Sequence, residues 1–144
     1  MTTLATIGYQ SSTQADVISR LKAAGVETVV DVRAIAASRR AGFSKTVLAA
    51  SLAEAGIDYV HLRQLGTPKP GREAARKGRI AEMRTIFEDH LAEPSAQLEL
   101  KAAEELAGSR KIALLCFEAD HEGCHRSIVA ERICGHIGCS VEHL

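Results

Sequence analysis

The segment Cys116–Ser127 contains residue types that carry out chemistry in many enzymes. It reads Cys-Phe-Glu-Ala-Asp-His-Glu-Gly-Cys-His-Arg-Ser and joins the apolar run 111–115 to an amphipathic helical pattern. Either Cys116 or Cys124 could act as a nucleophile, because a thiolate is stabilised near a helix start. Glu118 could serve as a general acid or base beside the apolar strand end. We therefore expect Cys116, Glu118 and Cys124 to be catalytic.

Positive charge where the helical pattern begins would suit an anionic ligand. Arg126 occupies that position, and the first backbone N–H groups of a helix are unpaired and positively polarised. We expect Arg126 and its neighbours His125 and Ser127 to bind a substrate anion.

A second set of candidates follows two earlier β-prone runs. Asp31 and Arg33 alternate along one run, so both point to the same face of the strand. Arg33 could bind the substrate anion while Asp31, as a further catalytic candidate, orients it or accepts a proton. Arg39 on the next loop could add an anion contact. After the first run, Gly8 permits close backbone approach to a ligand, and Tyr9 could stack on it or form a hydrogen bond with it.

Each of these residues also has a structural interpretation. Cys116 could be a buried small hydrophobe, and Glu118 could simply pair with a nearby arginine. Asp31 and Arg33 could form a buried ion pair that holds loops together. We favour a role in the cleft for Asp31 and Arg33, because charges are rarely buried without a partner or a purpose. For Glu118 both interpretations remain open.

The cysteines allow two further hypotheses. Cys116, Glu118, Cys124 and His125 are ligand types for zinc, but adjacent residues at a helix start point in different directions. We therefore expect neither a metal nor another cofactor. A redox pair of Cys116 and Cys124 is conceivable, although a separation of eight residues is not the compact motif used for that purpose.

Strand and helix patterns alternate along the chain. Strands are expected at 5–9, 28–33, 58–62, 111–115 and 141–144. Helices are expected at 13–24 with Thr13 as the N-cap, between Ser44 and Gly56 with Ser44 as the N-cap, at 80–91, at 95–106 and from about Cys124 to 137. The polar segment 64–78 contains Pro68 and Pro70, and we expect it to be the longest loop and a mobile one.

This alternation favours a three-layer α/β fold with a mostly parallel sheet of about five strands and helices on both faces. Parallel strands leave their carboxyl ends at one edge of the sheet. We therefore expect the loops after Gly8, Arg33, Leu62 and Cys116 to gather around one cleft.

Length and composition restrict the class of protein. The chain has 144 residues, with 18 basic and 18 acidic side chains, so we expect a single domain over residues 1–144 without a global field for nucleic acid or lipid. No secretion signal or membrane-spanning run is evident, which favours a cytoplasmic protein that does not bind membranes. In that compartment Cys116 and Cys124 would be thiols rather than a structural bridge.

Short motifs occur throughout the chain: Thr6-Ile7-Gly8, Asp31-Val32-Arg33, Ser38-Arg39-Arg40, Phe43-Ser44-Lys45, Gln64-Leu65-Gly66, and Cys116-x-Glu118 followed by Cys124-His125-Arg126-Ser127. Together they resemble the domain of unknown function 488 family over nearly the whole chain. The family usually shows Gly-His-Ser where this chain has Gly8-Tyr9-Gln10-Ser11. Its name implies no established activity.

A looser similarity is to rhodanese-like sulfurtransferases. They also carry an Asp-x-Arg after an early strand, and a cysteine at a strand end followed by an Arg-Ser pair and a helix. Here nine residues, three of them acidic, separate Cys116 from Arg126, whereas a rhodanese loop is shorter.

Two classes of function fit these features. The first is a small cytoplasmic enzyme that binds an anionic substrate containing phosphate, a nucleotide or sulfur. The alternative is a non-enzymatic module that binds a small ligand or nucleic acid through the same arginines and the basic segment 69–79. Nucleic acid is the less favoured partner because the net charge is zero. The oligomeric state is left open.

Overall fold

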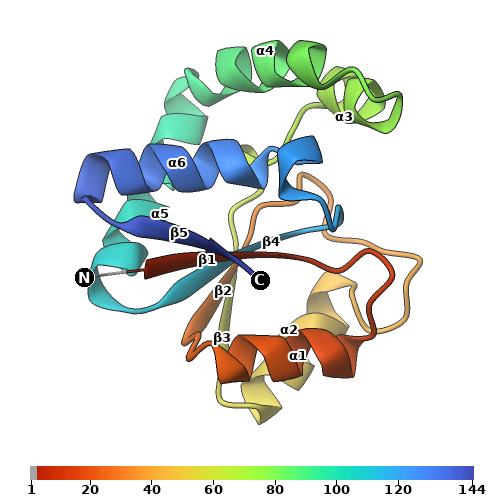
Figure 1. Ribbon diagram of the computed structural model, residues 1–144, viewed down its shortest axis with the longest axis vertical. Helices are drawn as coiled ribbons and strands as arrows, with labels where there is room; N and C mark the ends of the chain where they lie inside the picture. Colours follow the sequence, from red (N-terminus) through yellow and green to blue (C-terminus); the bar gives the residue numbers. More distant parts are fainter. Residues whose placement is uncertain (1–2) are drawn as a thin grey trace.

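The five strands within residues 3–144 belong to one parallel sheet, as expected. The structure, a computed structural model, describes residues 3–144. The strand order is β3-β2-β4-β1-β5 (Figure 1), and each neighbouring pair is parallel. The strands are β1 Thr3–Gly8, β2 Thr28–Asp31, β3 Asp58–His61, β4 Ile112–Cys116 and β5 Ser140–His143.

Helices cover both faces of this sheet, which confirms the three-layer α/β fold. On one face lie α1 Gln14–Ala23 and α2 Lys45–Glu54. The other face carries α5 Pro94–Ser109 and α6 Arg126–Ile137, with α3 Lys69–Arg76 and α4 Ile80–Leu91 farther out beyond them (Figure 1). Within residues 3–144, no helix combines the length and apolar character needed to cross a membrane.

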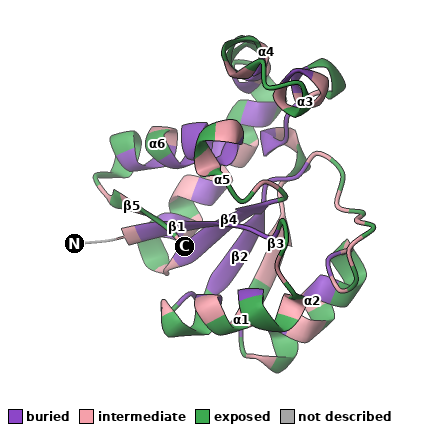
Figure 2. Ribbon diagram, turned by 45° about the vertical axis from the view of Figure 1, so that its right-hand side comes forward, coloured by how far each residue is buried: buried purple, intermediate pink, exposed green. Residues whose placement is uncertain are grey.

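Two hydrophobic cores hold these layers together. The purple segments in Figure 2 mark the buried residues, which include most of the three inner strands β2, β4 and β1. The core under α1 and α2 contains Phe43 and Leu48, whereas the core on the opposite face contains Phe87 and Leu100. Strand β4 contributes alternate side chains to both cores, as expected for a strand covered on both faces.

Local sequence signals explain most of the element boundaries. The backbone N–H of Asp16 donates to the Thr13 hydroxyl at 3.1 Å, so Thr13 caps α1 as predicted. Gly25 follows α1 with φ of 73°, a left-handed conformation that favours glycine. Pro94 is the first residue of α5, where a missing N–H costs nothing.

Two expectations about local structure were wrong. The segment 64–78 is largely helical instead of a long loop: a 3-10 turn at Arg63–Leu65 (η1) leads into α3. Pro70 lies in the first turn of α3, where proline starts a helix rather than interrupting it. Ser44 precedes α2, but its side chain bonds to the backbone of Ser38 and so does not cap the helix.

The loops at the carboxyl ends of β1 and β4 lie against each other. Gly8 pairs with Cys116 in the sheet register, and the next backbone N–H, that of Tyr9, donates to the Cys116 carbonyl. Beyond the sheet, the N–H of Gln10 donates to the Phe117 carbonyl at 2.8 Å. A Cβ on Gly8 would lie 1.7 Å from the Glu118 carbonyl oxygen, so this position excludes any side chain.

Replacing Gly8 by alanine should therefore destabilise the protein by about 1–3 kcal/mol or more, because the Glu118 backbone must move. The matched control is Gly108→Ala in α5, where no atom lies within 4 Å of the added Cβ. That control should raise stability by about 0.5–1 kcal/mol through helix propensity. Urea unfolding of the two variants measures both effects, and equal stability for Gly8→Ala and the wild-type protein would contradict the close approach.

Candidate active site

A large cleft opens at the carboxyl ends of the strands. Its volume is about 1270 Å³, and its walls come from the loops after β1, β2, η1 and β4 together with α3, α4 and the turn before α6. The loops thus gather as the sequence predicted. The predicted site residues that line the cleft are Tyr9, Arg33, Arg39, Cys116, Glu118, Cys124 and His125. Gly8, Asp31, Arg126 and Ser127 lie behind its wall.

Two sulfur atoms lie at the floor of this cleft. The structure joins Cys116 to Cys124, and it also joins Cys134 to Cys139. The expectation that Cys116 and Cys124 are separate thiols is therefore wrong in this structure. Residues 117–123 turn back on themselves through a 3-10 turn, His121–Gly123, so that the end of β4 and the start of α6 bring the two sulfurs together.

Cys116 lies between a cation and a carboxyl group. Its Sγ is 3.0 Å from Nη1 of Arg126 and 3.5 Å from a carboxylate oxygen of Glu118. Burial raises the pKa of Glu118, although the nearby charge of Arg126 partly counteracts the shift. A guanidinium beside sulfur favours the thiolate form whenever the cysteine is reduced, and a carboxyl with a raised pKa can hold a proton nearby.

Arg126 itself is buried and holds the loop after β4. Nη1 donates to the Glu118 carbonyl, and Nη2 donates to the Ala119 carbonyl at 3.2 Å. Burial lowers the pKa of Arg126 to about 10, with partial compensation by Glu118 and Asp120, so the guanidinium keeps its charge at neutral pH. These bonds direct the side chain toward the loop and Cys116 rather than toward the open cleft where we had placed a substrate anion.

His125 and Ser127 also bond within the protein. Nε2 of His125 lies 2.7 Å from the Val32 carbonyl, which can only accept, so Nε2 carries the proton and Nδ1 is left as an acceptor. Nδ1 faces Sγ of Cys124 at 3.7 Å. Burial lowers the pKa of His125 to about 4. The Ser127 hydroxyl donates to the Cys124 carbonyl at 3.1 Å and thereby supports the first turn of α6.

Asp31 and Arg33 form a buried ion pair, which is the structural alternative to the cleft role that we favoured. Nη2 of Arg33 donates to Asp31 at 2.6 Å, and Nε donates to the same carboxylate. Nη1 donates to the Tyr9 hydroxyl and the Phe43 carbonyl. Burial works to lower the pKa of Arg33, but the bonds and charge of Asp31 outweigh it and raise that pKa. Although Arg33 reaches the cleft wall, its guanidinium nitrogens are already engaged.

Tyrosines complete this network around the carboxylate. The Tyr59 hydroxyl donates to Asp31 at 2.5 Å, and burial together with that bond raises the pKa of Tyr59. The ring of Tyr9 stacks on Phe43 with centroids 4.3 Å apart. Nε2 of His61 lies 2.7 Å from the Arg33 carbonyl, so the side chain of this strand residue has a hydrogen-bond partner. The network fixes the loop after β2 rather than offering a free charge.

The cations left free for a ligand are other arginines. Arg39 and Arg76 line the cleft, and their side chains form no hydrogen bond or ion pair with any residue between 3 and 144. Arg40 and Arg72 line it as well, each with one bond to a backbone carbonyl. Sequence reasoning found Arg39 but assigned Arg72 and Arg76 to a loop. The 3.6-residue periodicity of 69–76, with Pro70 in its first turn, was the signal that could have placed both on one helix face.

Three possible metal ligands meet at the floor of the cleft. One ligand atom each of Cys116, Glu118 and Cys124 lie within 4.8 Å of one another. A tetrahedral zinc site would need a fourth ligand, and the Arg126 guanidinium, 3.0 Å from Cys116 Sγ, repels a cation there. The arrangement therefore fits thiol chemistry better than metal binding.

Comparisons with known proteins gave one match. The family described as Domain of unknown function DUF488 matches residues 13–133. No curated protein and no solved structure matches the chain, and the similarity to rhodanese-like sulfurtransferases is not shown. The matched range includes the ion pair Asp31–Arg33 and the segment from Cys116 to Ser127.

The low pKa of His125 predicts a pH dependence of stability. Because the folded-state pKa of about 4 lies below the ordinary 6.5, this histidine contributes stability above pH 6.5 that is lost as the pH falls toward 4. The shift corresponds to about 3 kcal/mol. His125→Gln, which keeps a donor for the Val32 carbonyl, should lose less stability over that window. Urea unfolding at successive pH values measures the difference, and parallel curves for both proteins would contradict a buried neutral imidazole.

Proposed function

Because the chain belongs to the DUF488 family, whose description assigns no activity, we propose from the geometry of the cleft that it is a small enzyme acting on an anionic substrate. The substrate class is a molecule that contains phosphate, a nucleotide or sulfur. Cys116 acts as the nucleophile, Glu118 carries the proton, and arginines of the cleft wall bind the anion.

The charge of the cleft wall is the observation that carries this proposal. Five arginines line the cleft, and Glu118 is the one acidic residue among its lining residues. The whole chain, by contrast, has a net charge of zero. A concave surface lined by one sign of charge focuses its field and attracts ligands of the opposite sign. Arg39 and Arg76 are the two whose guanidinium groups form no side-chain bond to the described residues.

The position of the reactive groups supports an enzyme over a simple binding module. Cys116 and Glu118 line the same cleft as these arginines, so a bound anion would lie within reach of both. Once the bond to Cys124 is reduced, Cys116 is a thiol next to a guanidinium and to a carboxyl group with a raised pKa, which is the combination that nucleophilic catalysis needs. Arg126 is a positioning residue here, because it fixes Cys116 and the loop of Glu118.

Anion binding should be visible as ligand-induced stabilisation. At a concentration a hundredfold above Kd, a ligand that binds only the folded state adds about 2.7 kcal/mol. Thermal unfolding with increasing pyrophosphate or sulfate measures the effect. The double variant Arg39→Gln/Arg76→Gln should weaken binding by about a hundredfold or more, since each of the two charged hydrogen bonds contributes roughly 1.5–3 kcal/mol.

The matched control for this experiment is Arg63→Gln/Arg84→Gln. It removes the same charge from exposed positions of η1 and α4 that do not line the cleft. Control and wild-type proteins should respond alike to the anions. Equal loss of stabilisation in both double variants would show that general surface charge, and not the cleft, binds the anion.

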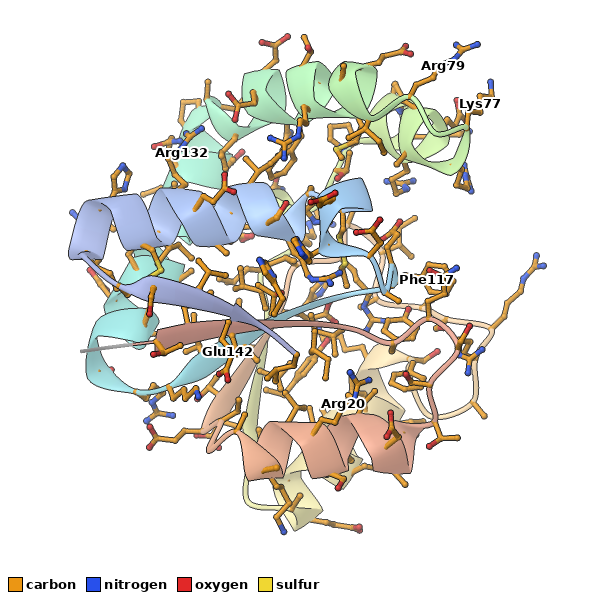
Figure 3. The ribbon with its side chains drawn as sticks, viewed as in Figure 1. Arg20, Lys77, Arg79, Phe117, Arg132 and Glu142 are labelled. Carbon is orange, nitrogen blue, oxygen red and sulfur yellow. A yellow bond between two sulfur atoms is a disulfide. The ribbon has the colours of Figure 1, made fainter. Side chains whose placement is uncertain are left out.

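The basic residues beyond the cleft favour nucleic-acid binding as a second candidate function. Lys77 and Arg79, between α3 and α4, are exposed and continue the positive charge outward, and Phe117 beside the cleft is 41% exposed. Figure 3 shows these three side chains on the same side of the molecule. An exposed aromatic ring next to arginines is a surface on which an unpaired base can stack.

Salt distinguishes the two candidates. Binding through several backbone phosphates weakens steeply as salt is added, because counterions are released, whereas a single anion in a partly buried cleft responds much less. We expect no mobility shift of single-stranded DNA or RNA at physiological salt. A retained complex at that salt, lost in Lys77→Gln/Arg79→Gln, would favour the nucleic-acid function.

A further inference from the structure

We propose that Cys116 and Cys124 form a redox-active dithiol that reduces an anionic disulfide bound in the cleft. This inference rests on the proposed function and specifies its reaction and substrate class. The bond between the two cysteines is the oxidised form that the reaction leaves behind.

The two cysteine pairs of this protein differ in ways that separate a reactive pair from a structural one. The Cα atoms of Cys134 and Cys139 are 4.5 Å apart, within the usual range of about 4.4–6.8 Å for disulfides. Those of Cys116 and Cys124 are 7.5 Å apart, a spacing that suits two thiols at least as well as a permanent link. Of the two pairs, Cys116 and Cys124 line the cleft. These residues are only 1% and 2% exposed, so a substrate disulfide would meet them from the cleft side alone.

Cys116 is equipped to attack first. Arg126 donates toward its sulfur at 3.0 Å and stabilises the thiolate, while the Glu118 carboxylate at 3.5 Å can take the proton. Burial raises the pKa of Glu118, which favours its holding that proton and returning it to a departing thiolate.

Cys124 is equipped to resolve the intermediate. The Val32 carbonyl holds the proton of His125 on Nε2, which leaves Nδ1 as an acceptor that faces the Cys124 sulfur at 3.7 Å. A hydrogen bond from the thiol to Nδ1 directs the sulfur and its lone pairs within the cleft. The two sulfurs already meet in the structure, so attack of Cys124 on Cys116 needs no large movement.

The reaction balances as a two-electron transfer. The Cys116 thiolate attacks one substrate sulfur, the substrate S–S bond breaks, and the departing thiolate takes the proton held by Glu118. Cys124 then attacks Sγ of Cys116, which breaks the mixed disulfide and releases the second thiol with the proton of Cys124. The substrate gains two electrons and the dithiol loses two. An external dithiol reductant restores the starting state.

Charge defines the substrate class. A disulfide whose two halves carry carboxylates would place them near Arg39 and Arg76, whereas a neutral disulfide gains nothing from these arginines. We therefore expect dithiodipropionate, a dianion, to react on the order of tenfold faster than neutral hydroxyethyl disulfide. This preference should be lost in Arg39→Gln/Arg76→Gln.

The experiment uses the Cys134→Ser/Cys139→Ser background, so that only Cys116 and Cys124 remain of the four cysteines. After reduction, the protein is mixed with dithiodipropionate and followed by intact mass. We expect the protein to lose two hydrogen atoms and to release two thiols without a lasting adduct. Adding Cys124→Ser should trap one propionate half on Cys116, and thiol-specific alkylation with peptide mapping locates it.

Two results would overturn the dithiol: no adduct in the Cys124→Ser protein, or a lasting mixed disulfide when both cysteines are present. If the Cys124→Ser protein does not fold, the Cys134→Ser/Cys139→Ser protein is used instead. The reaction is stopped, free thiols are alkylated with a light reagent, and thiols released by later reduction are alkylated with a heavy one. The heavy label shows whether Cys116 and Cys124 become oxidised together. Pyrophosphate stabilisation of a Cys116→Ser protein tests the anion cleft separately. If pyrophosphate stabilises the protein but no disulfide exchange occurs, the anion-binding cleft is supported and the dithiol proposal is wrong. If exchange occurs without a preference for the charged disulfide, the proposal of an anionic substrate is wrong.

Discussion

The buried guanidinium of Arg126 is the interaction on which the geometry of the site depends. One side chain from the first turn of α6 bonds to the sulfur at the end of β4 and to two consecutive carbonyls of the loop between them. Without it, the carbonyl groups of Glu118 and Ala119 would lose these bonds, at a cost of about 1–3 kcal/mol for each group that is buried. The loop therefore has a defined path, and Glu118 and Cys116 face the same space.

A second buried charge organises the opposite wall. Asp31 accepts bonds from Arg33 and Tyr59, and Arg33 continues to Tyr9 and to the Phe43 carbonyl. Removing one partner of such a network lowers the stability of the protein considerably, because the other charge is left buried without a counter-charge. The network connects the loops after β1 and β2 with strand β3. Residues of both networks line the cleft, and among its lining arginines Arg39 and Arg76 form no side-chain bond to the described residues.

The sequence predicted the fold and the location of the site better than the role of each residue. Alternating patterns place the loops after Gly8 and Cys116 together, because parallel strands share one carboxyl edge. The sequence pattern could not show that Asp31 forms an ion pair with Arg33. A charged residue in a strand gives the same pattern whether its partner is a bound ligand or another residue of the protein. The pairing of Cys116 with Cys124 depends on how residues 117–123 turn back, and that path follows from the buried contacts of Arg126 rather than from spacing. The prediction of a loop at 64–78 was wrong for a different reason. Proline is common both after the end of a helix and in its first turn, and Pro70 lies in the first turn of α3.

The placement of Arg39 and Arg76 has a consequence for how such a protein can change over generations. Both are exposed and lie outside the sheet, one on the loop after β2 and one at the end of α3. Substitutions there leave the packed interior untouched. If the proposed function is right, ligand preference can therefore change while the fold and the cysteine pair persist. Selectivity and stability would then be encoded by separate sets of positions, and a lineage could change its ligand at little thermodynamic cost.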